Sequence, residues 1–256
     1  MADQVLDGLR IAVLAADGFE QVELTQPVHA LRRQGAEVDI VSMRPGGIQG
    51  MNMLVPGECV DVDKTVKSAD VYDYDGLHIP GGFIGPDLVR QSMHALEFVR
   101  TFEDHGKPIA TICHGPWVLI SAGIVKGRRL AAWPGIQDDV RNAGGHWIDA
   151  RVVHDDNWVS SRGPQDLPAF CKAIVAHFAT AAGRPAPRTI PEVGLRGLLV
   201  GTAAVAAAGF AVQRRLGSAR GARSAAAARR GNGVRHIEEG MHGDGGDASY
   251  VTTGDR

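Results

Sequence analysis

The first 180 residues alternate between short apolar runs and longer stretches with helical spacing. Residues 10–16 (RIAVLAA) form an unbroken apolar run that stops at an Asp-Gly pair, which predicts a strand buried on both faces. The segments 76–82 (GLHIPGG) and 108–112 (PIATI) have the same character. Residues 36–42 (AEVDIVS) alternate apolar and charged positions, as a strand does. We therefore expect these segments to be the strands of a buried sheet.

Helical spacing is found between these predicted strands. The first such stretch has its apolar residues at Val22, Leu24, Val28 and Leu31. It stops at Gly35, a residue type common just past a helix C-terminus, and Pro27 suits either its first turn or a kink. Further helices are predicted at 86–105 and at 116–122, before Gly123. Strands that alternate with helices predict an α/β fold in which helices cover both faces of a parallel sheet.

The remaining segments before residue 181 carry weaker patterns. Residues 44–68 mix Gly and Pro with a VDVDKTV segment and predict short strands or loops. Residues 147–153 (WIDARVV) and 158–162 (WVSSR) predict a pair of strands joined across HDDN. A final helix is predicted by one apolar stripe, at Leu167, Cys171, Ile174 and Phe178.

The composition changes after residue 180. We expect a catalytic domain at 1–180, a Pro-rich linker at 181–196, an Ala/Gly-rich apolar segment at 197–213 and a disordered Arg/Gly-rich tail at 214–256. The net charge of −2 conceals a split, since residues 181–256 hold 11 Arg and 6 acidic residues and carry +5. The remainder carries −7. Opposite charges on the two parts predict different roles for them.

The tail raises the question of membrane contact. Its uncharged stretch, residues 197–212, would span about 24 Å as a helix, which is short of the ~30 Å hydrocarbon core. A helix lying on an anionic membrane surface or docking on a partner fits better than a spanning one. The Arg-rich part would allow weak contact with nucleic acid, but the sequence contains no motif that reads bases, so no specific nucleic-acid partner is expected.

The cysteines indicate a reducing environment. Their odd number, wide spacing and lack of a CxxC motif argue against a disulfide framework and a structural zinc site; they are Cys59, Cys113 and Cys171. The N-terminus has acidic residues and no basic leader before an apolar run, so a cytoplasmic protein is expected. Four residues of metal-binding type fit a solvated hairpin better than a metal site: His146, His154, Asp155 and Asp156. No cofactor is expected.

Cys113 lies where a predicted strand turns into a predicted helix. The free N–H groups and positive end of a helix N-terminus lower a thiol pKa and favour the thiolate. The backbone N–H of His114, the residue after this candidate nucleophile, can donate to an oxyanion. Gly81 and Gly82 follow the neighbouring strand and would supply a second donor at the same carboxyl edge of the sheet. This arrangement predicts a nucleophilic cysteine.

Two side chains are candidates for moving protons near this cysteine. Glu20, in the loop after the first strand, would hydrogen-bond Cys113 as a neutral acid or shuttle a proton. His114 is a candidate base. Because adjacent side chains on an elbow tend to diverge, we expect a loop or a second subunit to bring His114 to bear.

Several motifs together resemble the ThiJ/PfpI family, of intracellular cysteine protease-like and Parkinson-associated deglycase-like proteins. They occur in order over about residues 9–180: DGFEQVEL, PGG, Pro86–Asp87, ATICHGPW, WPGIQDDVRNAGG and SSRGPQDL. The resemblance implies a flavodoxin-like three-layer sandwich with a mostly parallel sheet, here followed by a C-terminal low-complexity extension. It also places this chain in the superfamily of class I glutamine amidotransferases.

The resemblance implies roles for particular residues. It makes Cys113 the nucleophile, Glu20 the acid after the first strand and His114 the following histidine. It implies that Asp87 from a neighbouring subunit orients the histidine, in a homodimer or homohexamer. One stretch departs from the pattern, because relatives often have Thr-Ser-Tyr where this chain has Ala131–Trp133. The loss of the tyrosine hydroxyl leaves the substrate preference open.

Three functions are compatible with the sequence. The first is a cysteine-dependent hydrolase that acts on small peptides or on reactive dicarbonyls such as methylglyoxal and their adducts, in stress protection. The second is a redox sensor or holdase that uses oxidation of Cys113. The third is a glutaminase, which is disfavoured because its chemistry expects a distant His-x-Glu. The nearest candidate here is the segment His154–Asp156.

Overall fold

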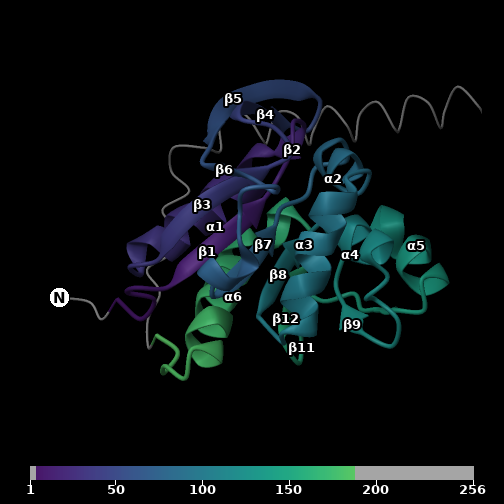
Figure 1. Cartoon of the computed structure of the whole chain (residues 1–256). Helices are drawn as coiled ribbons and strands as arrows, with labels where there is room; N and C mark the ends of the chain where they lie inside the picture. Colours follow the sequence, from purple (N-terminus) through teal and green to yellow (C-terminus); the bar gives the residue numbers. More distant parts are fainter. Residues whose placement is uncertain (1–3, 188–256) are drawn as a thin grey trace, which may run out of the picture. The chain divides into compact units, whose positions relative to one another are not determined.

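A computed structural model describes residues 4–187, which form a three-layer α/β sandwich (Figure 1). The central sheet has the strand order β11-β12-β8-β7-β1-β3-β6, and every neighbouring pair is parallel except β11 and β12. Its strands are β1 Arg10–Leu14, β3 Glu37–Ser42, β6 Lys64–Thr65, β7 Gly76–Ile79, β8 Ile109–Ile112, β11 Val153–Asp155 and β12 Trp158–Ser161. The α/β class and the mostly parallel sheet are therefore confirmed.

Helices cover both faces of this sheet. One face packs against α1 Gln21–Arg33 and α6 Leu167–Ala181. The other face packs against α3 Met93–Asp104, α4 Pro116–Ala122 and α5 Gln137–Asn142. The short helix α2, Gly85–Val89, follows β7, and single 3-10 turns lie at Val71–Asp73, Pro134–Ile136 and Pro164–Asp166.

Strand β1 shows why the core has two halves. Ile11 and Val13 belong to the cluster under α1 and α6, whereas Ala12 and Leu14 belong to the cluster under α3 and α4. Successive side chains of a strand point to opposite faces, so a strand buried on both faces must be apolar throughout. The unbroken apolar run that predicted this strand has this physical cause.

The structure differs from the sequence expectations in two helical regions. The stretch 86–105 forms two helices, because Ser92 interrupts it and caps α3 by accepting a hydrogen bond from the Ala95 N–H at 3.3 Å. Pro27 lies in the interior of α1, beyond its first turn. The carbonyl that the missing Pro27 N–H would bind belongs to Glu23, four residues earlier.

The strand regions also differ in detail. Residues 44–68 contain an antiparallel hairpin of full-length strands, β4 Gly46–Asn52 and β5 Val55–Val62, and β4 pairs with the short β2, Phe19–Glu20. The predicted strand 147–153 is mostly absent, since only β11 pairs with β12 across the turn. Its beginning belongs to β10, His146–Trp147, which pairs with β9, Arg129–Leu130.

Within residues 4–187, no helix combines the length and apolar character that a membrane-spanning helix requires. The end of the predicted linker, from residue 188, the apolar segment 197–213 and the tail 214–256 lie outside the described residues. Their predicted roles stay predictions.

A polar network joins α3 to the end of the sheet at β12. The Glu103 carboxylate accepts hydrogen bonds from Trp158 Nε1 at 2.6 Å and Asn157 Nδ2 at 3.0 Å, and it pairs with Arg128 Nη1 at 3.2 Å. The Arg128 guanidinium lies 4.1 Å from the centroid of the Trp158 ring. One carboxylate therefore satisfies the indole of a fully buried tryptophan and a largely buried cation.

Replacing Glu103 by Ala should lower the free energy of unfolding by about 2–3 kcal/mol, because Trp158 Nε1 loses its acceptor and Arg128 loses a charge partner. Urea denaturation at neutral pH measures this. Glu97→Ala, an exposed position on the same helix, is the matched control and should change stability by about 0.5 kcal/mol or less. Equal effects of the two substitutions would contradict the importance of the network.

Candidate active site

Cys113 occupies a strained turn between β8 and α4. Its φ is +60°, in the left-handed region that non-glycine residues rarely adopt. The side chain is 5% exposed. Gly115 makes the close turn possible, since a Cβ there would lie 2.7 Å from the Ile79 carbonyl oxygen. The predicted elbow is thus present, with the cysteine on it.

Backbone donors approach the cysteine sulfur from two loops. The N–H groups of Gly82 and His114 both interact with the Cys113 thiol and lower its pKa. Gly81, the other expected donor, has a different partner, because its N–H donates to Glu23 Oε2 at 3.0 Å. The pair of donors available at the sulfur is therefore Gly82 and His114.

The carboxyl beside the thiol belongs to Glu23, not to Glu20. Glu23 is fully buried in the first turn of α1 and its side chain interacts with Cys113. Gly81 lies between them: a Cβ there would clash with Glu23 Oε2 and would lie 2.5 Å from Cys113 Cβ. Glu20 is 8% exposed, and its carboxylate accepts a hydrogen bond from the Met53 N–H at 3.0 Å. Burial raises the pKa of Glu20 as well.

The sequence analysis did not single out Glu23, although a signal for it exists. Glu23, Pro27 and Leu31 are spaced by four residues, so they share one face of α1, and all three are buried. A carboxyl group on the core-facing stripe of a helix is unusual and indicates a special role. The motif-based choice of Glu20 overlooked this periodicity.

His78, on the neighbouring strand β7, holds the backbone of Glu23. Its fully buried ring lies with Nε2 3.0 Å from the Glu23 carbonyl oxygen, the acceptor that Pro27 leaves without a helical partner. Burial lowers the pKa of His78 to about 4, so the ring is neutral at pH 7 and carries one N–H, which can donate from Nε2 to this carbonyl or from Nδ1 to the Ala110 carbonyl oxygen 3.3 Å away. The interior proline thus creates an acceptor, and His78 uses it to tie α1 to the sheet.

Cys113 and Glu23 together carry at most one negative charge near neutral pH. Burial raises the pKa of Glu23 to about 8, and the nearby charge of Glu20 adds to this. Burial raises the pKa of the Cys113 thiol as well, and an ionised Glu23 raises it further. Two adjacent anions in a buried site repel each other strongly, so the pair titrates as a coupled unit. At pH 7 Glu23 is a neutral acid that can donate to the sulfur.

His114 reaches the cysteine within a single chain. Its Nδ1 lies 3.2 Å from Cys113 Sγ, although the two residues are adjacent. Burial lowers the pKa of His114 to about 4, so the imidazole is neutral at pH 7 and can accept a proton. We expected that a loop or a second subunit would have to turn this ring toward the sulfur, but in the structure the ring reaches the sulfur without either.

Asp87, the residue expected from a neighbouring subunit, lies exposed on α2. Its carboxylate accepts a hydrogen bond from Gln91 Nε2 at 3.1 Å in its own chain. His154, considered for a glutaminase, lies against His177 of α6 with ring centroids 5.9 Å apart. Among residues 4–187, no group of three or more His, Cys, Asp or Glu side chains is arranged to hold a metal ion.

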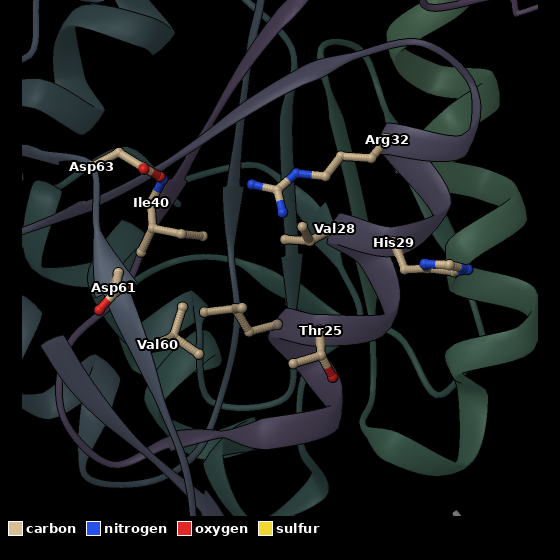
Figure 2. A pocket seen from close by; sticks show the side chains of 9 residues that line it. Thr25, Val28, His29, Arg32, Ile40, Val60, Asp61 and Asp63 are labelled. Carbon is tan, nitrogen blue, oxygen red and sulfur yellow. The ribbon is translucent and has the colours of Figure 1, made fainter. Parts of the chain in front are cut away.

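A cavity of about 410 Å³ lies away from the cysteine, between α1, β3 and β5 (Figure 2). The Arg32 side chain points into it and the His29 ring points away (Figure 2). Apolar and polar side chains line it: Leu24, Thr25, Val28, His29, Arg32, Ile40, Val60, Asp61 and Asp63. None of the candidate catalytic residues is among them, so this cavity is separate from the candidate site at the sheet edge.

The coupling of Cys113 and Glu23 should be visible in the rate of Cys113 alkylation as a function of pH. The native protein should give a two-step profile, and Glu23→Gln a single step, because the amide cannot titrate. Glu20→Gln should keep two steps. Iodoacetamide alkylation followed by mass spectrometry measures the rates at Cys113. If Glu23→Gln kept the two-step profile, or if only Glu20→Gln lost it, the carboxyl group that titrates with Cys113 would be that of Glu20 and not that of Glu23.

The Glu23 carboxyl should make the protein less stable as the pH rises. Between the ordinary Glu pKa of 4.5 and the folded value of about 8, the native state keeps a proton that the unfolded state has lost. The free energy of unfolding therefore decreases across this window. The stability of Glu23→Gln relative to the native protein should rise from pH 4.5 to 8 in denaturation experiments. Glu97→Gln, an exposed control, should parallel the native protein. Parallel curves for Glu23→Gln would contradict the buried neutral acid.

Comparison with known proteins identifies the family. A model of the DJ-1/PfpI family matches residues 9–177. A deglycase from Pyrococcus abyssi is 45% identical over 167 residues, covering 65% of this chain and 98% of that protein. Protein/nucleic acid deglycase 2 from Escherichia coli is 42% identical over 164 residues, covering 63% and 92%. The oxidized structure of Toxoplasma gondii DJ-1 is similar with a TM-score of 0.60 at 27% identity, covering 69% and 97%. The chain belongs to the DJ-1/PfpI family.

Proposed function

We propose that this protein is a cysteine-dependent hydrolase in which Cys113 attacks the carbonyl carbon of a small peptide, or of a reactive dicarbonyl or its adduct. The observation that carries the proposal is the close approach at Gly81, where the Glu23 carboxyl, Cys113 and the His114 backbone nitrogen meet, with His114 Nδ1 3.2 Å from the buried Cys113 Sγ. The names of the relatives, which are deglycases, support the adduct arm. On this basis we propose a role in stress protection.

The proposed reaction begins with proton transfer from the Cys113 thiol to His114 Nδ1, which lies 3.2 Å away. The sulfur then forms a bond to the carbonyl carbon, and the carbonyl oxygen takes the electron pair. The N–H groups of Gly82 and His114 lie where they can stabilise this oxyanion. In a hydrolysis, the imidazolium returns the proton to the leaving amine, and water then cleaves the carbon–sulfur bond and restores the thiol.

Glu23 has a separate role in this scheme. As a neutral acid at pH 7 it can donate a hydrogen bond to the thiolate without adding a second charge. The ionised form would oppose formation of the thiolate. The raised pKa of Glu23 therefore favours the reactive state of Cys113 over the working range of pH.

We further propose that the protein acts as a homodimer or homohexamer in a reducing cytoplasmic setting. Asp87 is exposed on α2, beside the exposed apolar side chains of Phe83, Ile84 and Leu88. An apolar patch of this kind supports contact with a second copy. Such a contact would allow Asp87 from a neighbouring subunit to approach the site.

A redox sensor is the second candidate. The N–H donors at the sulfur, together with a neutral Glu23, would hydrogen-bond the oxygens of a sulfinic acid on Cys113. The glutaminase alternative lacks such support, because the histidine considered for it lies against α6.

Replacing Cys113 by Ser should lower the turnover of methylglyoxal, of glycated lysine and of short fluorogenic peptides by about a thousandfold or more on whichever of them the native protein acts. Cys59→Ser is the matched control, since Cys59 is an exposed cysteine outside the site, and it should keep full activity.

Full activity in Cys113→Ser would exclude the proposed mechanism. Absence of turnover on all three substrates, combined with the selective gain of two oxygen atoms by Cys113 under mild peroxide, would instead favour the redox sensor. Mass spectrometry of the peptide that contains Cys113 measures that gain.

A further inference from the structure

The imidazole of His114 contacts two tryptophan rings. The Trp117 ring meets it edge to face, with centroids 4.9 Å apart and an interplanar angle of 61°. The Trp133 ring stacks on it at 6.0 Å and 25°. Aromatic pairs of these two geometries are favourable and restrict ring orientation. The imidazole that contacts Cys113 is therefore restricted by contacts with two aromatic rings.

Trp117 is itself anchored by a neighbouring helix. Its Nε1 donates a hydrogen bond of 2.8 Å to Asp139 Oδ2 on α5. The Arg90 guanidinium lies over the Trp117 ring, 5.5 Å from its centroid. Trp133 is anchored through its backbone, since its N–H donates to the Cys113 carbonyl oxygen at 2.9 Å. The Trp117 ring is thus fixed by side-chain contacts, and the Trp133 backbone by a hydrogen bond, and none of these contacts involves the imidazole.

These contacts account for an unusual geometry. Side chains of adjacent residues at an elbow tend to point apart, yet Nδ1 of His114 lies 3.2 Å from Cys113 Sγ. A free imidazole at a half-buried position would sample several rotamers, most of which place Nδ1 away from the sulfur. The two tryptophan rings occupy space next to the imidazole and so restrict the rotamers that it can adopt.

We propose that Asp139, acting through Trp117, and Trp133 are positioning residues that hold the His114 imidazole on the Cys113 sulfur within one chain. The proposal rests on the proposed function for its catalytic consequence, since the ring positioned in this way is the acceptor of the thiol proton. Its geometric content is independent of any reaction. It assigns the orientation of His114 to a carboxylate of the same chain, whether or not a second subunit is present.

Asp139 has two separable effects on His114. Its hydrogen bond fixes Trp117, and its negative charge raises the pKa of His114 against the lowering effect of burial. Asp139→Asn removes the charge but keeps an oxygen that can accept from Trp117 Nε1. Asp139→Ala removes the charge and the acceptor oxygen, and Trp117→Phe keeps an aromatic ring at this position while removing the indole N–H. Asp138→Ala is the matched control, because Asp138 is an exposed carboxylate of the same helix paired with Arg141 at 3.0 Å.

The experiment follows the His114 imidazole by NMR in protein with labelled histidine, using His114→Gln to identify its signals. Asp139→Asn should keep the cross-peaks between His114 and both tryptophans, while its titration moves to lower pH. Asp139→Ala should lose the cross-peaks to both tryptophans, and Trp117→Phe should lose the remaining cross-peak between His114 and Trp133. In the same two variants kcat should fall about tenfold to a hundredfold with little change in KM, because a displaced base weakens the reaction more than substrate binding. Asp138→Ala should match the native protein.

Unchanged cross-peaks to both tryptophans in Asp139→Ala, together with an unchanged cross-peak to Trp133 in Trp117→Phe, would overturn the proposal, as would equal effects of Asp138→Ala and Asp139→Ala. Thermal denaturation of each variant separates positioning from a general loss of structure. Should Cys113→Ser prove fully active, the proposed function fails, while the cross-peaks still decide whether Asp139 and the tryptophans position His114.

Discussion

The site depends on the close approach of three chain segments at Gly81. Gly81 lies two residues after the end of β7, and the backbone there passes between the Glu23 carboxyl of α1 and Cys113, which directly follows β8. A Cβ at this position would lie 2.5 Å from Cys113 Cβ, so any larger residue would push the two groups apart. The parallel order β8-β7-β1 makes this approach possible, because parallel neighbours bring the loops at their carboxyl ends to one edge of the sheet.

The second constraint is electrostatic. A carboxyl and a thiol are enclosed at this approach with little water, so only one of them can carry a charge. The Gly81 N–H binds the carboxyl, and the N–H groups of Gly82 and His114 serve the sulfur. The loop after β7 therefore provides one backbone N–H to the Glu23 carboxyl and one to the Cys113 sulfur, and the elbow at Cys113 provides a second N–H to the sulfur. Such a pair can hold or release a single proton near neutral pH, which is a useful property for a nucleophile.

Two structural details connect this site to the rest of the fold. Pro27 frees the Glu23 carbonyl inside α1, and the buried His78 binds it, so the first turn of this helix is tied to β7. On the other side of the sulfur, Asp139 of α5 binds Trp117 of α4 and thereby restrains His114. The carboxyl partner and the histidine partner of Cys113 are thus each held by a residue that lies outside the elbow.

The sequence alone was sufficient for the features that depend on local pattern. The apolar runs predicted β1, β7 and β8 correctly, because a strand buried on both faces must be apolar in sequence. They also placed Cys113 on the elbow between β8 and α4. Local pattern failed where a competing partner decided the outcome. The segment 147–153 had the alternation of a strand, yet its first residue pairs with β9 and only its last belongs to β11.

Which side chains meet at the sulfur was decided only by the tertiary structure. Glu20 and Glu23 both follow the first strand, and the sequence motif favoured Glu20. The direction of α1 turns Glu23 into the core against Gly81 and directs Glu20 to the Met53 N–H of the hairpin. In the same way, adjacency in sequence suggested that the His114 side chain would point away from Cys113. In the structure its ring packs against Trp117 and Trp133 and directs Nδ1 toward the sulfur. Sequence pattern reports whether a residue is buried, but its partner depends on how distant segments pack, and here that packing determined the chemistry.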